Sequence, residues 1–314
     1  MKQFICHQSA LEYWRRSRKL PANSAARRCR DSLPDKPSKL YPLVFSEFEH
    51  PVHILIGDRG ARQSSEKIRP HLFSSETPVG CFMNIGERLM VCTPEFCFLQ
   101  MAESFTLIKL IELGYELSGG YSIPLANEQV VPERGFYNRA PLTSAKKLRV
   151  FLNGMTGVKG HQKAMQALRY TLDGSASPME TKLAMFLTLP YKLGGFGFSL
   201  PDMNKRIPLI KNTKKYSGKA YYICDLFWSD EKVAVEYDSD QQHTGSDRIA
   251  YDSKRRNALN SLGIRIVSIT KQQLYDSVEL ESAARAIAGY MNKRLFSKES
   301  NFAAAHRKLR KQLL

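Results

Sequence analysis

Acidic residues follow directly on the most apolar strand that the sequence predicts. Residues 233 to 235 (Val-Ala-Val) indicate a buried strand, and Glu236, Asp238 and Asp240 come immediately after them. Carboxylates are almost never buried unpaired, because removing an unpaired charge from water is energetically costly. We therefore expect a positive charge, from the protein or from a bound ion, close to these acids.

A predicted β-hairpin over residues 221 to 238 brings a further acid to this place. With a two-residue loop at 230–231, Asp225 lies directly opposite Glu236 on the neighbouring strand. Side chains alternate between the two faces of a strand, so Asp225, Glu236 and Asp238 are expected on one face. Like charges about 5 Å apart repel each other, and a slip of one residue in the register would separate them. Packing alone gives no reason to bring these carboxylates together.

A hard divalent cation accounts for the three carboxylates most simply. Mg²⁺, or Mn²⁺ in its place, binds carboxylate oxygens, keeps several waters and commonly binds a substrate phosphate as well. The predicted metal ligands are Asp225, Glu236 and Asp238. The alternative is that internal arginines neutralise the acids, and Arg255 and Arg256 on the following helix are available for this role.

The elements around the hairpin predict an α/β domain over residues 175–296. Ser177 to Glu180 is typical of a capping box, with Ser at the N-cap position and Pro and Glu in the first helical turn. The expected order is α, β, β, α, β, α, with room for one further strand directly after the first two. After the hairpin come a helix over roughly 247–262, the strand IRIVSIT and a last helix over roughly 277–295.

Four other parts are predicted outside this domain. Thr93-Pro94-Glu95 is a typical helix start, and short strand-like runs precede it. Several prolines after residue 31 indicate a linker. The four parts are a basic helical segment with its linker over 1–45, a small α+β domain over 46–135, a basic linker helix over 136–174 and a basic tail over 297–314.

The net charge of +17 over 314 residues indicates a polyanionic partner. Residues 134 to 172 contain many basic residues and no Asp or Glu, which is typical of a track for nucleic-acid phosphates. The alternative is a solvated basic face on a connecting helix. The candidate DNA-binding residues are Lys146, Lys147, Arg149, Lys159, Lys163 and Arg169.

The sequence predicts no membrane span. No apolar run reaches the roughly 18 residues that a span needs, and the N-terminus lacks the long apolar core of a signal peptide. We therefore expect a cytoplasmic protein that does not enter a membrane. The six cysteines include no C-x-x-C pair, so reduced and mostly buried thiols are expected.

The acidic hairpin and the elements after it resemble a known nuclease family. An Asp late in one strand is followed by an E-x-D strand end, a nearby His, a D-x-x-R helix and a glycine that leads into an apolar strand. This ordered set resembles the very-short-patch-repair-like group of the PD-(D/E)xK nuclease superfamily, and more narrowly a bacterial domain of unknown function within that group. The matching positions are Asp225, Glu236, Asp238, His243, Asp252, Arg255, Gly263, Ile266 and Val267, with Glu180 near the start of the first helix.

The resemblance implies a restriction-endonuclease-like mixed sheet flanked by helices, and an Mg²⁺- or Mn²⁺-dependent endonuclease that hydrolyses DNA phosphodiester bonds. Many members carry an E-x-K lysine that orients the attacking water. Asp238 stands in that place here, so another residue must supply the positive charge. The candidate catalytic residues are Asp225, Glu236, Asp238, Glu180, His243, Lys254 and Arg255.

Several of these residues also have simpler interpretations. Glu180 could complete the capping box only, and Asp240 could lie in a solvated turn. Asp252 and Arg255 could form an ion pair on the surface of a helix. His243 could equally be a surface residue.

The N-terminal half shows a more limited similarity to abortive-infection antitoxin-type regulators, which would imply that this half binds DNA. The chain is thus expected to be an endonuclease in repair or in defence against phage and mobile elements. The alternative is a catalytically inactive DNA-binding regulator that keeps the nuclease fold. A third hypothesis is an interaction protein within a defence or toxin–antitoxin pair.

Overall fold

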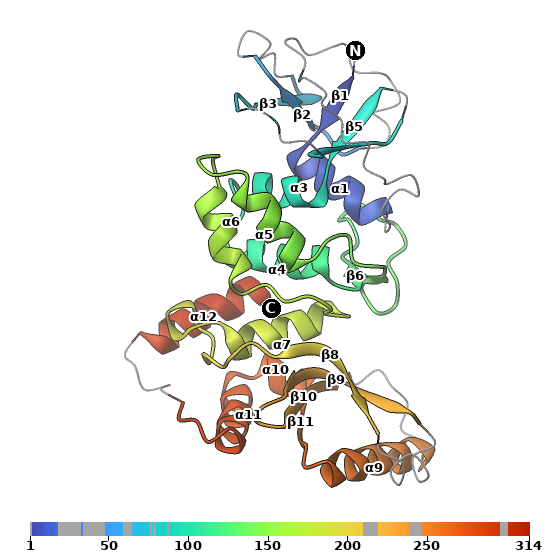
Figure 1. Ribbon diagram of the computed structural model, residues 1–314, viewed down its shortest axis with the longest axis vertical. Coiled ribbons are helices and arrows are strands. Elements are labelled where there is room, and N and C mark those ends of the chain that lie inside the picture. The colour runs from blue at the N-terminus through green and yellow to red at the C-terminus, as the bar shows by residue number, and fades with distance from the viewer. Residues whose placement is uncertain are drawn as a thin grey trace. The chain divides into compact units, whose positions relative to one another are not determined.

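The computed structural model of the chain divides into two compact units, Met1–Thr171 and Leu172–Leu314 (Figure 1). The division falls close to the boundary expected after residue 174. None of the described residues forms a helix long and apolar enough to span a membrane. The structure describes residues 2–17, 33, 48–58, 65–75, 77, 80–86, 88–209, 219–238, 246–295 and 301–314, and of residues 246–252 it describes the backbone alone.

The first unit is built on a five-stranded sheet with the order β3-β2-β1-β5-β4. Its strands are β1 (Gln3–Ile5), β2 (Val52–Ile56), β3 (Ile68–Leu72), β4 (Phe82–Asn84) and β5 (Leu89–Cys92). The first residues of the chain form the central strand, because β1 pairs antiparallel with β2 and parallel with β5. The described N-terminal residues, expected as a separate basic segment, therefore belong to the first unit.

The helices of the first unit include the region expected as a basic linker. The helix start at Thr93 is confirmed, since its side chain accepts a hydrogen bond from the N–H of Phe96. The predicted linker helix over 136–174 is instead two helices, α5 and α6, which pack against α3 and α4. The remaining elements are α1 (His7–Ser17), α3 (Pro94–Met101), α4 (Leu107–Ser118), β6 (Tyr121–Ser122), β7 (Tyr137–Asn138), α5 (Ala145–Asn153) and α6 (His161–Leu168).

The second unit contains a four-stranded mixed sheet with the order β11-β10-β9-β8. The fourth strand, β8, precedes the hairpin, whereas the sequence left room for one after it, and β8 pairs antiparallel with β9. The β9–β10 pair is antiparallel and the β10–β11 pair is parallel, so this unit is a mixed α/β structure. Its elements are α7 (Pro178–Thr188), η2 (Tyr191–Leu193), β8 (Asp202–Pro208), β9 (Tyr221–Trp228), β10 (Val233–Asp238), α9 (Ser246–Ser261), β11 (Arg265–Thr270), α10 (Lys271–Tyr275), α11 (Ser277–Tyr290) and α12 (Phe302–Leu313).

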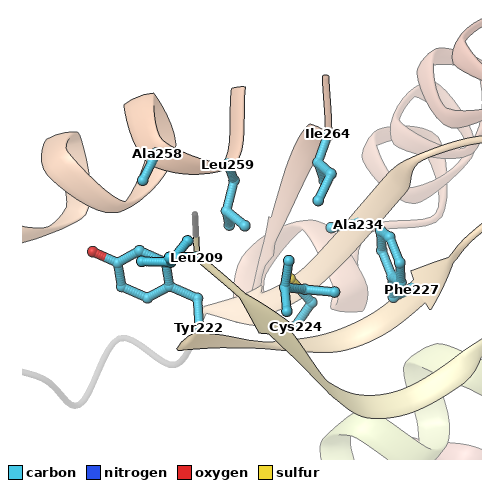
Figure 2. Close-up of a cluster of buried hydrophobic side chains, with 9 residues drawn as sticks. Leu209, Tyr222, Cys224, Phe227, Ala234, Ala258, Leu259 and Ile264 are labelled. Carbon is cyan, nitrogen blue, oxygen red and sulfur yellow. The ribbon is translucent and has the colours of Figure 1, made fainter. Parts of the chain in front are cut away.

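Apolar side chains cover both faces of strand β10, as its unbroken apolar run predicts. Residues 233, 234 and 235 are all fully buried, and α7 contacts β9 and β10. Figure 2 shows the apolar layer between the sheet and α9, which also includes Ile264 directly before β11. The side chains in that layer include Tyr222, Cys224, Phe227, Ala234, Ala258, Leu259 and Ile264. This packing fixes the ends of β9 and β10, where the acidic residues lie.

The expected basic tail contains a packed helix, α12. Phe302, His306, Leu309 and Leu313 recur at helical spacing and are buried, so they form one apolar face. His306 Nδ1 lies 2.7 Å from the carbonyl oxygen of Gly194, next to η2. The described part of the tail is therefore an integral part of the second unit.

Candidate active site

The hairpin has the predicted register with a longer turn. Its three ladder pairs are Val233↔Trp228, Ala234↔Phe227 and Val235↔Leu226. The turn comprises residues 229–232 rather than 230–231, and Lys232 has a positive φ of 53°. A two-residue loop requires residues that readily adopt positive φ, and Asp-Glu does not suit this requirement. The longer loop leaves the pairing of the strands unchanged.

Asp225 lies one step beyond the last ladder pair and supports the end of β10. Its Oδ2 accepts a hydrogen bond from the N–H of Tyr237 at 2.8 Å. On its other side, the β8–β9 ladder omits the position of Asn204, whose φ of 48° is in the left-handed region. The regular pairing of β9 therefore ends at Asp225 on the β10 side and is interrupted there on the β8 side.

Glu180 reaches this place from the start of α7. Ser177 caps the helix, because its Oγ accepts from the N–H of Glu180 at 3.1 Å. The Glu180 carboxylate accepts from the N–H of Ala176 at 2.9 Å and from Nδ2 of Asn204 at 2.6 Å. The capping interpretation is thus confirmed for Ser177, while the carboxylate binds a residue before the cap and also a strand residue. Glu180 is buried, and burial raises its pKa.

Three carboxylates influence one another around Asp225. Burial, together with the negative charges of Glu180 and Glu236, raises the pKa of Asp225 from 3.8 to about 7. The N–H of Tyr237 and the guanidinium of Arg255 act in the opposite direction. At neutral pH, both the protonated and the ionised form of Asp225 are therefore populated, because burial and neighbouring negative charges disfavour the ionised form.

Arg255 on α9 neutralises Glu236. Its Nη2 forms an ion pair with Glu236 Oε1 and also donates to the carbonyl oxygen of Ile223 at 2.5 Å. Only 22% of the Arg255 side chain and 14% of the Glu236 side chain are exposed, so water screens the pair weakly. Of the two arginines considered from the sequence, the structure places Arg255 in this role, and Arg256 is exposed.

The other predicted site residues are exposed or lie outside the described part of the chain. Asp238 is exposed at the end of β10, and Lys254 is exposed on α9. His243 and Asp240 lie outside the described residues, as does the side chain of Asp252.

Compact groups of ligand atoms are rare in the described part of the chain. Only one group of three His, Cys, Asp or Glu side chains there has ligand atoms within 4.8 Å of one another, and it consists of Cys6, His7 and His71 in the first unit. The carboxylates around Asp225 are more widely spaced. Burial, together with the neighbouring imidazoles, lowers the pKa of His7 to about 2. The sequence analysis missed this group, since only the adjacent Cys6-His7 pair is visible and His71 comes from a distant strand.

The six candidate DNA-binding residues all belong to the first unit. Four of them are exposed on the surface: Lys146, Lys147, Arg149 and Arg169. Lys159 forms an ion pair with Glu103 at 2.7 Å, and Lys163 donates to the carbonyl oxygen of Phe105 at 2.9 Å. The exposed residues on α5 therefore form the more accessible part of this basic stretch.

Comparison with known proteins returned no relative. No family model, no curated protein and no solved structure matches the chain.

Proposed function

We propose that the second unit is a metal-dependent endonuclease domain that hydrolyses DNA phosphodiester bonds, in repair or in defence against phage and mobile elements. The observation that carries this proposal is the position of Asp225 beside both Glu180 and Glu236. Repulsion between three carboxylates at a half-buried end of the sheet destabilises the fold. A bound cation, which also binds a substrate phosphate, would relieve this repulsion.

The order of elements supports a restriction-endonuclease-like fold for this unit. One helix, α7, precedes three strands in which each neighbouring pair is antiparallel, and α9 then connects β10 to the parallel strand β11. The acids come from the first turn of α7, from β9 and from the end of β10. This is the order of positions that the resemblance implies.

Asp225 and Glu236 are the residues that would hold Mg²⁺ or Mn²⁺. They fit such an ion, because a hard cation needs only one or two protein carboxylates and completes its shell with waters and substrate phosphate. When bound, the ion would lower the pKa of a water and stabilise negative charge on the reacting phosphate. Asp238, at the exposed end of β10, is the candidate for a further ligand or for orienting the water.

The remaining residues would act by charge and position. Glu180, fixed by Ala176 and Asn204, keeps a proton available on Asp225 near neutral pH. Arg255 holds Glu236 and could contact a phosphate from the same place. Lys254 and His243 are the other candidates for the positive charge that an E-x-K lysine would otherwise supply.

DNA binding is proposed for the basic residues of α5 and for Arg169. When binding depends on phosphate contacts, the logarithm of the binding constant falls linearly with the logarithm of the salt concentration, with a slope of about −0.9 for each phosphate contacted. Fluorescence anisotropy with duplex DNA over a range of salt concentrations would measure this slope. A flat salt dependence, or no binding, would argue against nucleic acid as the partner.

A second candidate function is a DNA-binding regulator without catalytic activity. The ion pair between Arg255 and Glu236 favours it, because the guanidinium already supplies the positive charge that the acid needs. Such a protein could act with a partner in a defence or toxin–antitoxin pair. It would bind DNA in the same way with or without Mg²⁺.

Nicking of supercoiled plasmid separates these functions. We expect the wild type to nick DNA with Mg²⁺ or Mn²⁺, and Glu236→Gln to lose this activity. Glu231→Gln is the matched control, because Glu231 lies in the turn of the same hairpin and pairs with Lys293 at 2.9 Å. Absence of nicking in all three proteins, with intact DNA binding, would support the regulator. Equal nicking by wild type and Glu236→Gln would contradict the assigned site.

A further inference from the structure

Three histidines and a cysteine meet beside the sheet of the first unit. Cys6 and His7 join β1 to α1, while His53 lies on β2 and His71 on β3. Cys6 Sγ is 3.2 Å from His7 Nδ1, and His71 Nε2 is 3.1 Å from His53 Nδ1. The rings of His7 and His71 stack with their centroids 3.6 Å apart. Segments far apart in the sequence thus place nitrogen and sulfur atoms together.

The backbone holds the first two of these residues firmly in place. The N–H of Cys6 donates to the carbonyl oxygen of His53 at 3.0 Å, and the N–H of His7 donates to Oε1 of Gln100 at 2.9 Å. His7 also has a positive φ of 49°, a conformation that is uncommon for residues other than glycine. Backbone conformations of this kind are concentrated at binding and catalytic sites.

We propose that Cys6, His7 and His71 bind a divalent transition-metal ion of the Zn²⁺ class. Thiolate and imidazole are the ligands that Zn²⁺ prefers, whereas Mg²⁺ and Ca²⁺ prefer oxygen. With bond lengths of about 2.3 Å to sulfur and about 2.0 Å to nitrogen, tetrahedral coordination separates neighbouring ligand atoms by roughly 3.3–3.6 Å. The separation of 3.2 Å between Cys6 Sγ and His7 Nδ1 is close to this value, and the three ligand atoms all lie within 4.8 Å of one another.

The His71 ring must tilt when the ion binds. An ion bonds in the plane of an imidazole, but the stacked rings of His7 and His71 have planes only 17° apart and cannot both point at one ion. His71 can adjust, since it is half-buried and β3 is the outer strand of the sheet. Cys6 and His7 are buried and stay in place. His53, in contact with His71, is a positioning residue for this ligand.

Three protein ligands leave one coordination position open. A water would complete the tetrahedron, as in zinc sites that are not closed by a fourth side chain. The ion would join the β1–α1 connection to β3, and it would therefore stabilise the folded first unit over the unfolded chain.

Cobalt substitution tests the site directly. The full-length protein is reduced, stripped of metal with a chelator and titrated with Co²⁺, which reports thiolate bonding through a charge-transfer band in the near ultraviolet. We expect the band in the wild type, its disappearance on adding Zn²⁺, and its loss in Cys6→Ser. Cys81→Ser is the matched control, because Cys81 is a buried thiol of the same unit outside the group, and it should keep the band.

The histidines give an independent measurement. His71→Gln should lose the tetrahedral visible bands of cobalt, and His53→Gln should weaken Zn²⁺ binding by about 10- to 100-fold in competition with a chelating dye. Circular dichroism of each variant checks its fold, and if Cys6→Ser does not fold, the half-buried His71 decides the matter. Absence of the charge-transfer band in the wild type, its survival in Cys6→Ser, or unchanged affinity in His71→Gln would overturn the proposal. Each of these results is independent of nuclease activity in the second unit.

Discussion

Replacement of Asp225 by Asn should stabilise the second unit, and the gain should grow with pH. Asp225→Asn removes a carboxylate from the neighbourhood of Glu180 and Glu236 without changing its size. The Asn side chain keeps an oxygen that can accept the N–H of Tyr237, so the hydrogen bond that supports β10 is retained. The main change is therefore electrostatic.

The magnitude follows from the shifted pKa. Folding raises the pKa of Asp225 from 3.8 to about 7, so the native state binds more protons than the unfolded state between these pH values. Stability consequently falls as the pH rises through this window and levels off above it. At 1.36 kcal/mol for each pKa unit, the wild type loses about 1.5 kcal/mol by pH 5 and at most about 4 kcal/mol by pH 8. Asp225→Asn avoids this loss.

Urea denaturation at pH 5 and pH 8 measures the difference in the free energy of unfolding between the two proteins. The chain has two tryptophans, Trp14 in the first unit and Trp228 in the second. Labelling with 5-fluorotryptophan gives each unit its own ¹⁹F signal, and the Trp228 signal reports the unit that carries Asp225. Ionisable groups that do not interact with Asp225 affect both proteins equally, so they cancel in the difference.

Asp230→Asn is the control, because it removes an exposed carboxylate from the turn of the same hairpin. We expect its stability difference from the wild type to stay within about 0.5 kcal/mol at both pH values. At pH 8, Mg²⁺ should stabilise the wild type more than Asp225→Asn, since a ligand stabilises only by binding the native state. A gain from Asp225→Asn that is the same at pH 5 and pH 8 would refute the reasoning.

Two further substitutions, each with a control variant, test contacts within the second unit. Arg255→Met should destabilise the second unit by about 2 kcal/mol, because it leaves the half-buried Glu236 without its charged partner; Arg256→Met, on the exposed side of the same helix, should change the urea midpoint little. Gly195→Ala should lower the melting temperature and destabilise the protein by about 1–3 kcal/mol, because a Cβ there would lie 2.1 Å from the carbonyl oxygen at the end of α7. Gly289→Ala lies in the last turn of α11, where an added Cβ would meet nothing within 4 Å, and should instead stabilise by about 0.4–1 kcal/mol. Equal effects of the two changes would contradict this.

Local sequence patterns were sufficient for the elements that carry the acids. A hairpin loop centred on residues 230–231 predicted the register of the strands, because the position of the loop decides which residues lie opposite each other. Ser177 and Thr93 predicted two helix starts, since a side-chain oxygen at the N-cap satisfies a backbone N–H only a few residues away. These features depend on neighbours in the sequence, and the order of elements in the second unit followed from them.

Contacts between distant segments were decided by the tertiary structure alone. Packing of α9 on the sheet selected Arg255 rather than Arg256 as the partner of Glu236, a choice that the helical pattern left open. Packing of α7 brought Glu180 to Asp225, although its capping role explains its position in the sequence equally well.

The first unit shows the same limit more strongly. β1 became the central strand of a sheet whose other strands come from residues 52 to 92, and this pairing placed Cys6 and His7 beside His71. No local sequence pattern predicts this contact between distant residues, because the free energy that favours it comes from burying side chains of segments that are far apart in the chain.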